Sequence, residues 1–438
     1  MTNLRSALHQ FHGDVYRYLG ASTLVGFSYF GFVAVLLNLY LLRLGYGTDF
    51  IGLVNGSTAL AFAASSLPAG AIGSRFGMRR AVMGGMGFLA AGVMLVPVVA
   101  LLPAGGTRDV AIITMRVLSG IGFSLYMVNA YPYLVVATDA RDRPYAFALL
   151  AAIPPVAGFA GSIVSGALPG WIAGGMGLDS ADPLPFGLIL FVAGAILLPT
   201  PWIVARTRDL EPPKRRRNGN ARRRTAREVR SAHGALFLVI FFLGITALLR
   251  MAGESAARSF FNVYLELDLG ASTSRIGLLL AFGQLVAGPA ALCAPALANR
   301  HGKMPVIVVT TATTAASLVV MALVPHWVAA GIGFTLVVGM RSVTQSVTSV
   351  VHMEIVPASR RGITSGVVSM SMGLGFSSMA LGGGYLIPAL GFPGLYLLAA
   401  LLTALSALIF WQYFRVPQGE YRLATADEPA AAAPMQRS

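Results

Sequence analysis

The chain has 438 residues, of which 56% are hydrophobic and only 11% are charged, and its mean hydropathy is +0.71. A composition this apolar excludes a soluble globular protein and indicates an integral membrane protein. The formal net charge of +15 comes largely from arginines between apolar stretches, which is typical of membrane topology and argues against a nucleic-acid-binding protein.

The charged residues separate apolar stretches of about 20 residues or more, the length that an α-helix needs to cross a bilayer. Continuous apolar runs without a ten-residue alternation favour helices over a membrane β-barrel. The predicted spans of the first half are 18–43, 50–73, 80–102, 109–137, 144–172 and 184–206. Those of the second half are 234–267, 274–299, 304–325, 328–356, 362–388 and 391–414.

The two halves resemble each other at an offset of about 225 residues, and self-similarity at a fixed offset indicates a repeat architecture. Two parallel halves in a membrane chain are typical of a transporter whose site lies at their interface. We therefore predict an all-α membrane protein with about twelve transmembrane helices in two pseudo-symmetric six-helix bundles. The predicted parts are an N-terminal bundle at 1–206, a basic cytoplasmic linker at 207–233, a C-terminal bundle at 234–415 and a disordered cytoplasmic tail at 416–438.

Basic residues gather in the loops after the even-numbered spans, and short basic loops stay on the cytoplasmic side of a membrane. Both termini are therefore expected in the cytoplasm, with the chain in the plasma or inner membrane. Within the linker, residues 208–231 carry two arginine clusters. They either hold the following span in register or bind anionic lipid headgroups.

Near its outer end span 1 carries Asn38-Leu39-Tyr40, and span 7 repeats this pattern as Asn262-Val263-Tyr264. The copied asparagine and tyrosine are interpreted either as a packing or gating device or as contacts to a substrate. Asn129 in span 4 and Gln284 in span 8 are further polar candidates for a cavity inside the membrane.

Span 4 carries Arg116, and Arg341 occupies the equivalent place in span 10. A charged side chain in so apolar a helix is costly, so it is expected to face a cavity or a partner, or else to snorkel to the outer surface.

Span 7 carries three charges, Arg250, Glu254 and Arg258, at steps of four residues. This spacing puts them on one helix face, with each arginine within reach of the carboxylate. One interpretation is an ion cluster that neutralises itself and locks the span against a neighbour. The other makes Glu254 a protonation or substrate-contact site. Because arginine outnumbers glutamate inside the predicted membrane region, the substrate is expected to carry a carboxylate or phosphate, or to be an amphiphile with an anionic head.

Twelve spans in two halves with a basic central loop resemble the major facilitator superfamily of secondary transporters. Residues 70–80 resemble its signature Gly-x-Leu-Ala-Asp-Arg-x-Gly-Arg-Lys between spans 2 and 3, and residues 295–303 are a weaker copy. The resemblance implies rocker-switch transport, with these loops latching the halves together in the outward-facing state. The latch residues that it implies are Gly70, Arg75, Gly77, Arg79, Arg80, Arg300, Gly302, Lys303, Glu354 and Arg361.

Two positions depart from the superfamily's pattern, because Ser74 and Asn299 stand where an aspartate usually holds the latch. A weaker or differently paired latch is therefore expected. Glu354 and Arg361 have the spacing of the superfamily's Glu-x6-Arg motif. The segment that Arg116 begins resembles the Arg-x-x-x-Gly-x-Gly signature, which is linked to coupling in proton-coupled members.

The chain has only two lysines, Lys214 and Lys303, and neither is followed by serine or threonine, as a phosphate-binding loop requires. We therefore predict a protein that is not an enzyme and has no cofactor or metal. It is expected to be a gradient-driven transporter of a small molecule, anionic or amphiphilic, working by alternating access with efflux favoured. The expected partners are the substrate, protons and the bilayer, and the expected state is a monomer. The alternatives are a proton-coupled multidrug exporter, a lipid flippase, and a membrane sensor or scaffold that transports nothing.

Overall fold

The computed structural model describes residues 13–139, 143–208, 226–356 and 361–415. The secondary structure of this part of the chain is helical throughout and contains no β-strand, in agreement with the all-α prediction. Helices suit the apolar sequence because lipid offers no partner for backbone N–H and C=O groups, which must bond within the span.

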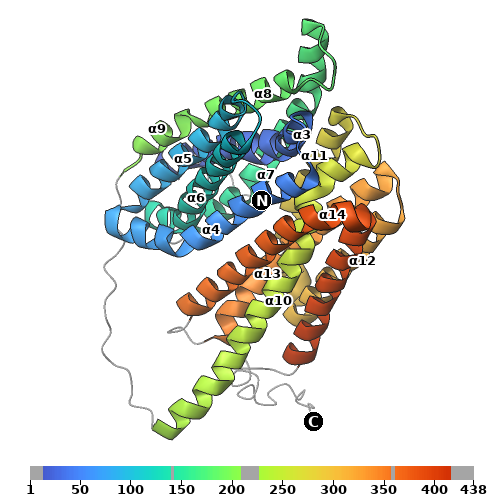
Figure 1. The fold of residues 1–438 in the computed structure, drawn as a ribbon. Helices are drawn as coiled ribbons and strands as arrows, with labels where there is room; N and C mark the ends of the chain where they lie inside the picture. Colours follow the sequence, from blue (N-terminus) through green and yellow to red (C-terminus); the bar gives the residue numbers. More distant parts are fainter. Residues whose placement is uncertain (1–12, 140–142, 209–225, 357–360, 416–438) are drawn as a thin grey trace, which may run out of the picture.

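The first half contains six membrane-crossing segments (Figure 1). The first of them is continuous from Gly13 to Arg43 but has a π-helical middle. Its parts are α2 (Gly13–Val25), η1 (Gly26–Val33) and α3 (Ala34–Arg43). The others are α4 (Thr48–Phe76), α5 (Met78–Val99), α6 (Gly106–Ala137), α7 (Arg143–Met176) and the pair α8 (Pro183–Leu197) and α9 (Pro199–Ala205).

The second half repeats this arrangement. Its helices are α10 (Ala226–Leu267), α11 (Thr273–His301), α12 (Lys303–Leu323), α13 (Trp327–Ile355) and α14 (Arg361–Phe414). Within α14 the backbone leaves the helical region at Gly391, where φ is 68°, between Pro388 and Pro393. Of the described residues, 11 helices are long and apolar enough to cross a membrane, and the last of these contains two of the predicted spans. The prediction of about twelve spans is thereby confirmed.

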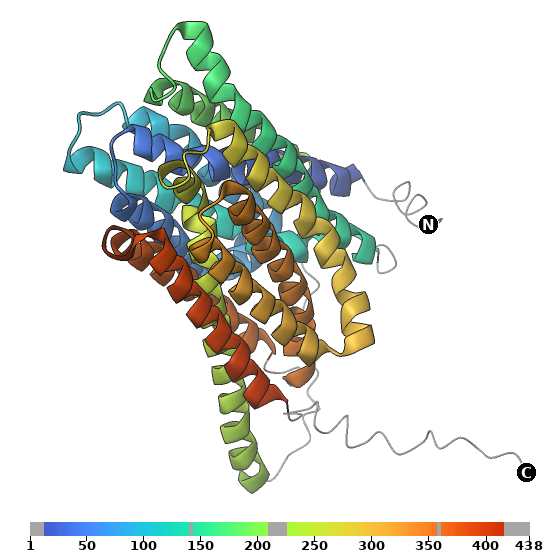
Figure 2. The same ribbon diagram turned by 90° about the vertical axis from the view of Figure 1, so that its right-hand side faces the viewer.

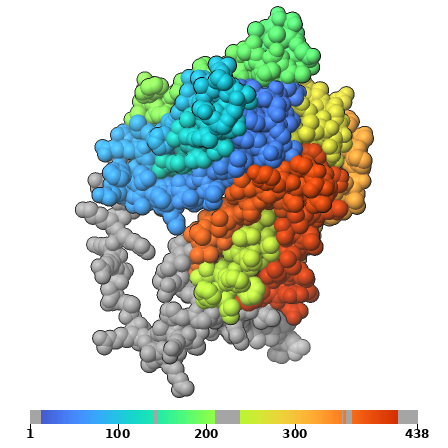
Figure 3. All heavy atoms as spheres, viewed as in Figure 1, coloured from blue at the N-terminus to red at the C-terminus, as the bar shows by residue number. Residues whose placement is uncertain are grey.

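The two halves form separate helical bundles that meet along a broad interface. Figures 1 and 2 show the blue-to-green first half beside the yellow-to-red second half, and the space-filling view in Figure 3 shows their boundary. Across this boundary α4 packs against α14, and α7 packs against α11. The first segment and α10 also meet there, so the residues between the bundles come from both halves.

Glycines allow the two bundles to approach each other closely. A Cβ atom added at Gly52 would lie 2.6 Å from the Ala380 carbonyl oxygen and 2.9 Å from Gly384 Cα. At Gly277, the repeat of Gly52, it would lie 2.5 Å from the Ser162 carbonyl oxygen. Gly52 and Gly277 therefore mark equivalent helix crossings, at which only the absence of a side chain lets the backbones touch.

Candidate functional site

A cavity of about 310 Å³ lies between the two halves. Its wall combines aromatic, amide and arginine side chains, which suits a small molecule with apolar and charged parts. The first half contributes Tyr29, Phe30, Val33, Ala34, Leu37, Asn38, Asn55, Arg116 and Pro155. The second half contributes Arg258, Leu280, Gln284, Ala287, Phe334, Val338, Arg341 and Ser342.

The π-helix η1 shapes one side of this cavity. Added Cβ atoms at Gly26 and Gly31 would lie 2.6 Å from backbone atoms of α7, so the two helices pack backbone against backbone. Tyr29 and Phe30, which line the cavity, lie between these glycines, and the ring of Tyr29 stacks on Phe123 at 5.1 Å. Single π-helical turns are frequent at functional sites, but the sequence carried no signal that predicted this one.

Three arginines reach the cavity from three helices. Arg116 of α6 is only 4% exposed, and its Nε and Nη1 atoms have no hydrogen-bond partner among the described residues. Arg258 of α10 is exposed within the cavity, with its guanidinium 5.8 Å from the centre of the Phe376 ring. Arg341 of α13 is partly exposed. The repeat partners Arg116 and Arg341 therefore line one cavity from opposite halves.

Glu254 is 2% exposed and lies beside the cavity wall. Its Oε2 atom is 2.8 Å from Nε of Arg341, and its Oε1 atom is 3.9 Å from Nε of Arg250. Sequence spacing placed both span 7 arginines within reach of this carboxylate, but the structure pairs it with Arg250 and with Arg341 of α13. Arg258 points into the cavity instead.

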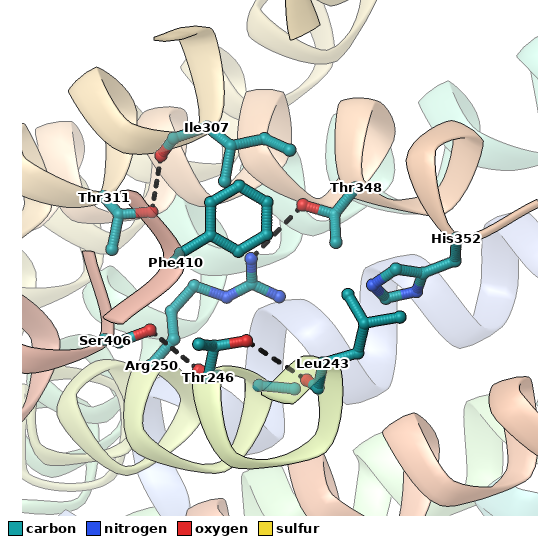
Figure 4. Close-up of a pocket in the computed structure, with 10 residues that line it drawn as sticks. Leu243, Thr246, Arg250, Ile307, Thr311, Thr348, His352, Ser406 and Phe410 are labelled. Atoms are coloured by element: carbon teal, nitrogen blue, oxygen red, sulfur yellow. Dashed lines mark hydrogen bonds between the residues drawn. The ribbon is translucent and has the colours of Figure 1, made fainter. Parts of the chain in front are cut away.

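Arg250 faces away from the cavity, into the interior of the second half (Figure 4). Its Nη1 atom donates a hydrogen bond of 3.4 Å to Thr348, and His352 lies nearby in the wall of the same small pocket. Glu254 therefore separates two environments, because Arg341 reaches the cavity and Arg250 is enclosed by the C-terminal bundle.

The repeated asparagines meet each other across the interface. Asn38 donates hydrogen bonds to the Ser259 carbonyl oxygen at 2.7 Å and to Asn262 Oδ1 at 3.0 Å. Asn262 in turn donates to the Val35 carbonyl oxygen at 3.1 Å. Asn55 of α4 completes the network by donating to Asn38 Oδ1 at 3.1 Å. This network closes the cavity on the side away from the arginine-rich loops.

An ion pair reinforces this closed end. Arg43, at the end of α3, pairs with Glu266, near the end of α10, and its guanidinium also lies 5.0 Å from the ring centre of Phe186. Both charged side chains are mostly buried, so water screens the pair less than it would at an open surface.

The two repeated tyrosines lie in the cores of their own halves. Tyr40 is 4% exposed and packs beside Gly187 of α8. Tyr264 is 1% exposed and donates its hydroxyl hydrogen to the Met321 carbonyl oxygen at 3.1 Å. Neither tyrosine is among the residues that line the cavity. This arrangement favours packing over substrate contact for the tyrosines.

The two remaining amide candidates differ in location. Gln284 lines the cavity and donates a long hydrogen bond of 3.5 Å to the Phe30 carbonyl oxygen in the other half. Asn129 instead joins α6 to α4 by donating to the Ala69 carbonyl oxygen at 3.1 Å. An added Cβ atom at Gly73 would lie 1.7 Å from Asn129 Oδ1, so this glycine makes room for the amide.

The two signature loops share one backbone turn. Gly77 and Gly302 precede α5 and α12 with φ values of 96° and 85°, a region that glycine adopts without steric cost. Arg79 donates to the carbonyl oxygens of Thr207 at 2.8 Å and Ala205 at 3.1 Å. Lys303 pairs with Glu354. These contacts join helices within one half.

The other latch candidates lie at the same end of the molecule. Arg75, Arg80 and Arg300 are exposed, and Gly70 packs beside Val128. Arg75 also lies 5.5 Å from the ring centre of Phe76. The side chain of Arg361, most of the 208–231 linker and the 416–438 tail lie outside the described residues.

Two kinds of functional candidate were missed by the sequence analysis. Asn55 could have been found by the rule that selected Gln284, since it is an amide in an apolar span. The aromatic wall of Tyr29, Phe30 and Phe334 looks like ordinary apolar sequence and gave no signal. Among the described residues, no group of three His, Cys, Asp or Glu side chains is arranged to hold a metal ion.

Comparisons with known proteins agree with this architecture. The profile of the Major Facilitator Superfamily matches residues 18–252 and 243–436. A search of curated proteins gave no match.

Several solved transporters share the fold. The nucleoside transporter NupG matches with a TM-score of 0.65 at 16% identity, over 92% of this chain and 100% of that chain. The inward-open xylose transporter XylE from E. coli matches with a TM-score of 0.69 at 13% identity, over 94% of this chain and 99% of that chain. An inward-facing, unoccupied bacterial homologue of the human lysosomal transporter Spinster matches with a TM-score of 0.67 at 14% identity, over 94% of this chain and 96% of that chain. The chain therefore belongs to the Major Facilitator Superfamily and is a multi-pass membrane protein with the fold of its secondary transporters.

Proposed function

We propose that this transporter moves a small organic anion by alternating access and binds it in the central cavity. The observation that carries this proposal is the charge of the wall, where Arg116, Arg258 and Arg341 outnumber the single nearby carboxylate, Glu254. Unpaired cations away from bulk water are costly, and an anion that fills the cavity relieves that cost through charge-assisted hydrogen bonds.

The size and composition of the cavity narrow the substrate further. A volume of about 310 Å³ is at the lower end of small-molecule sites. Tyr29, Phe30 and Phe334 offer apolar and aromatic surface beside the arginines. These features support a metabolite-sized anion with an apolar part, and they favour it over a two-chain lipid, which is larger than this cavity.

The contacts between the halves support an inward-facing state. The Asn38–Asn262 bond and the Gly52 and Gly277 crossings lie toward the ends opposite the basic loops. If those loops are cytoplasmic, as the excess of arginine predicts, the outer side is closed and the cavity is reached from the cytoplasm. Both termini then lie in the cytoplasm, and we propose that the protein works as a monomer in the plasma or inner membrane.

In the proposed site, Glu254 is the residue expected to couple transport to protons. When Glu254 is ionised, it holds Arg341 at 2.8 Å and offsets its charge. A proton on the carboxylate removes this competition and strengthens the field that an anion meets, so proton and anion are expected to bind together. Net efflux, which the sequence pattern favours, then runs down the substrate's own gradient and carries a proton outward with it.

The test is equilibrium binding to purified protein, with benzoate as the anion, betaine as the zwitterion and tetraphenylphosphonium as the cation. We expect benzoate to bind most tightly, and Arg258→Gln to weaken its binding about tenfold by removing one charge-assisted contact. Arg275→Gln is the matched control, because Arg275 lies over Trp327 and is not part of the cavity wall. Tightest binding of the cation would overturn the proposal and favour a multidrug exporter.

A further inference from the structure

Two of the cavity's cations remain uncompensated. Arg341 is paired with Glu254 at 2.8 Å. In the described part of the chain, neither Arg116 nor Arg258 has a carboxylate within ion-pair distance. The cavity therefore presents two free guanidinium groups to whatever fills it.

Arg116 is the more deeply buried of these two groups. It lies ten residues into α6, about 15 Å from the start of the helix at 1.5 Å per residue. It is 4% exposed, lines the cavity, and leaves both Nε and Nη1 without a hydrogen-bond acceptor. Burial at this depth argues against snorkelling to the membrane surface. A buried guanidinium with unsatisfied N–H groups suits an acceptor that carries negative charge, such as an oxygen of a carboxylate or phosphate.

Arg258 belongs to the opposite half of the molecule. It extends from α10 into the cavity and is exposed there, while Arg116 comes from α6 of the first half. The repeat does not require this arrangement, because the position equivalent to Arg258 in the first half is Ala34. The two free cations thus lie on the two bodies that move relative to each other in alternating access.

We infer that the substrate is a dianion that bridges the two halves, with one acidic group held by Arg116 and the other by Arg258. This inference rests on the proposed function and narrows its substrate class to dicarboxylates. A monoanion leaves one of the two arginines without a partner, whereas a dianion satisfies both. Because its two ends contact different halves, the dianion also draws the bundles together, which favours closure of the cytoplasmic side.

The test compares each dianion with a partner that lacks one charge, at one pH and one salt concentration. The probes are malonate, succinate, glutarate and phthalate, each against its monoamide. We expect at least one dianion to bind wild-type protein at least about tenfold more tightly than its partner, because the partner lacks one charge-assisted contact.

Two variants assign this preference to the named residues. In Arg116→Gln the dianion is expected to bind only as tightly as its partner, while the monoamide keeps its affinity through Arg258. Arg258→Gln, a change in the other half, is expected to abolish the same preference for the dianion. The test therefore remains decisive if one variant fails to fold. Arg275→Gln should retain the wild-type ratio.

The outcomes separate this inference from the proposed function. Equal affinity for every dianion and its partner in wild-type protein overturns the bridge but leaves an anion transporter in place. A wild-type preference that survives both Arg116→Gln and Arg258→Gln also overturns the bridge. If no anion binds more tightly than tetraphenylphosphonium, the proposed function itself is wrong.

Discussion

The first segment and α10 are equivalent elements of the two halves, and they differ in an informative way. Both carry an asparagine at the repeated position, and Asn38 and Asn262 bond to each other across the interface. The charges of α10, however, correspond to Gly26, Phe30 and Ala34 in the first segment. The repeated asparagines thus close the bundles on each other, whereas the charges unique to α10 provide its charge chemistry.

The glycines at the helix crossings are a second case in which repeated residues hold the two halves together. Gly52 and Gly277 are repeats, and each allows backbone contact with the opposite half. The arginines differ from the glycines in this respect. Arg116 and Arg341 are repeats, but among the residues that the structure describes only Arg341 has an acidic partner, Glu254. One repeated pair of positions has therefore acquired two roles through a single acidic residue in α10.

The largest effect is expected from separating this arginine pair. Arg341→Gln leaves Glu254 buried with only the more distant Arg250, so we expect a loss of about 3 kcal/mol in stability. Arg116→Gln should leave stability unchanged or raise it, because it removes a buried cation that pairs with no carboxylate in the described part of the chain. Thermal unfolding in one detergent measures both variants, and Glu254→Gln should rescue Arg341→Gln. Equal destabilisation by the two arginine variants would contradict the assignment.

The next effect concerns closure at the repeated glycines. Gly52→Leu forces a side chain against the Ala380 carbonyl and Gly384, and overpacking of this kind costs about 1–3 kcal/mol. We expect the outer side to open, and Gly277→Leu to do the same from the other crossing. The measurement is labelling of Ser342→Cys, in a Cys293→Ser background, by an impermeant thiol reagent added outside. Gly84→Leu is the control, since an added Cβ atom there meets open space.

A smaller shift is expected at the asparagine pair. The bond that Asn38 and Asn262 share is worth about 1 kcal/mol, and each asparagine makes at least one further bond, so Asn38→Ala and Asn262→Ala should each raise outward accessibility at least about fivefold. A double-mutant cycle should show coupling between the two sites, because they share one bond. Asn129→Ala, whose bonds stay within the first half, should lower stability without changing accessibility. Additive effects at Asn38 and Asn262 would contradict a shared gate.

The smallest effect is expected at the cytoplasmic loop of the second half. Lys303 and Glu354 are each about one-third exposed and join helices of one bundle. Lys303→Gln should therefore cost less than about 1 kcal/mol and leave the labelling pattern unchanged. A large increase in outward accessibility would show instead that this pair contributes to the balance between the two states.

Most of the fold could be predicted from the sequence, because hydrophobic length and the repeat are strong signals. Continuous apolar stretches predicted the membrane spans, and the fixed offset between repeated residues such as Asn38 and Asn262 predicted the two halves. The boundaries were less certain. In particular, α10 begins at Ala226, ahead of the span predicted from 234, because a helix continues beyond the apolar residues that reveal it.

The site was only partly predictable, because spacing along one helix says nothing about neighbouring helices. It identified Arg250 as a partner of Glu254, but the shorter contact comes from Arg341, 87 positions further along the chain. Nor could it tell that Arg258 points into a cavity. The π-helix at Gly26–Val33 depends on close contact with α7, which is a property of packing rather than of local sequence.

Joint binding of an anion and a proton at a site containing Glu254 is tested most directly in liposomes with a pH-sensitive dye inside. Succinate, benzoate, betaine and tetraphenylphosphonium would be added outside wild-type protein and Glu254→Gln. We predict that an anion carries protons inward in wild type, and that the variant still exchanges the labelled anion but moves no protons. Protons moving opposite to the substrate, or equal proton movement in the variant, would contradict the account.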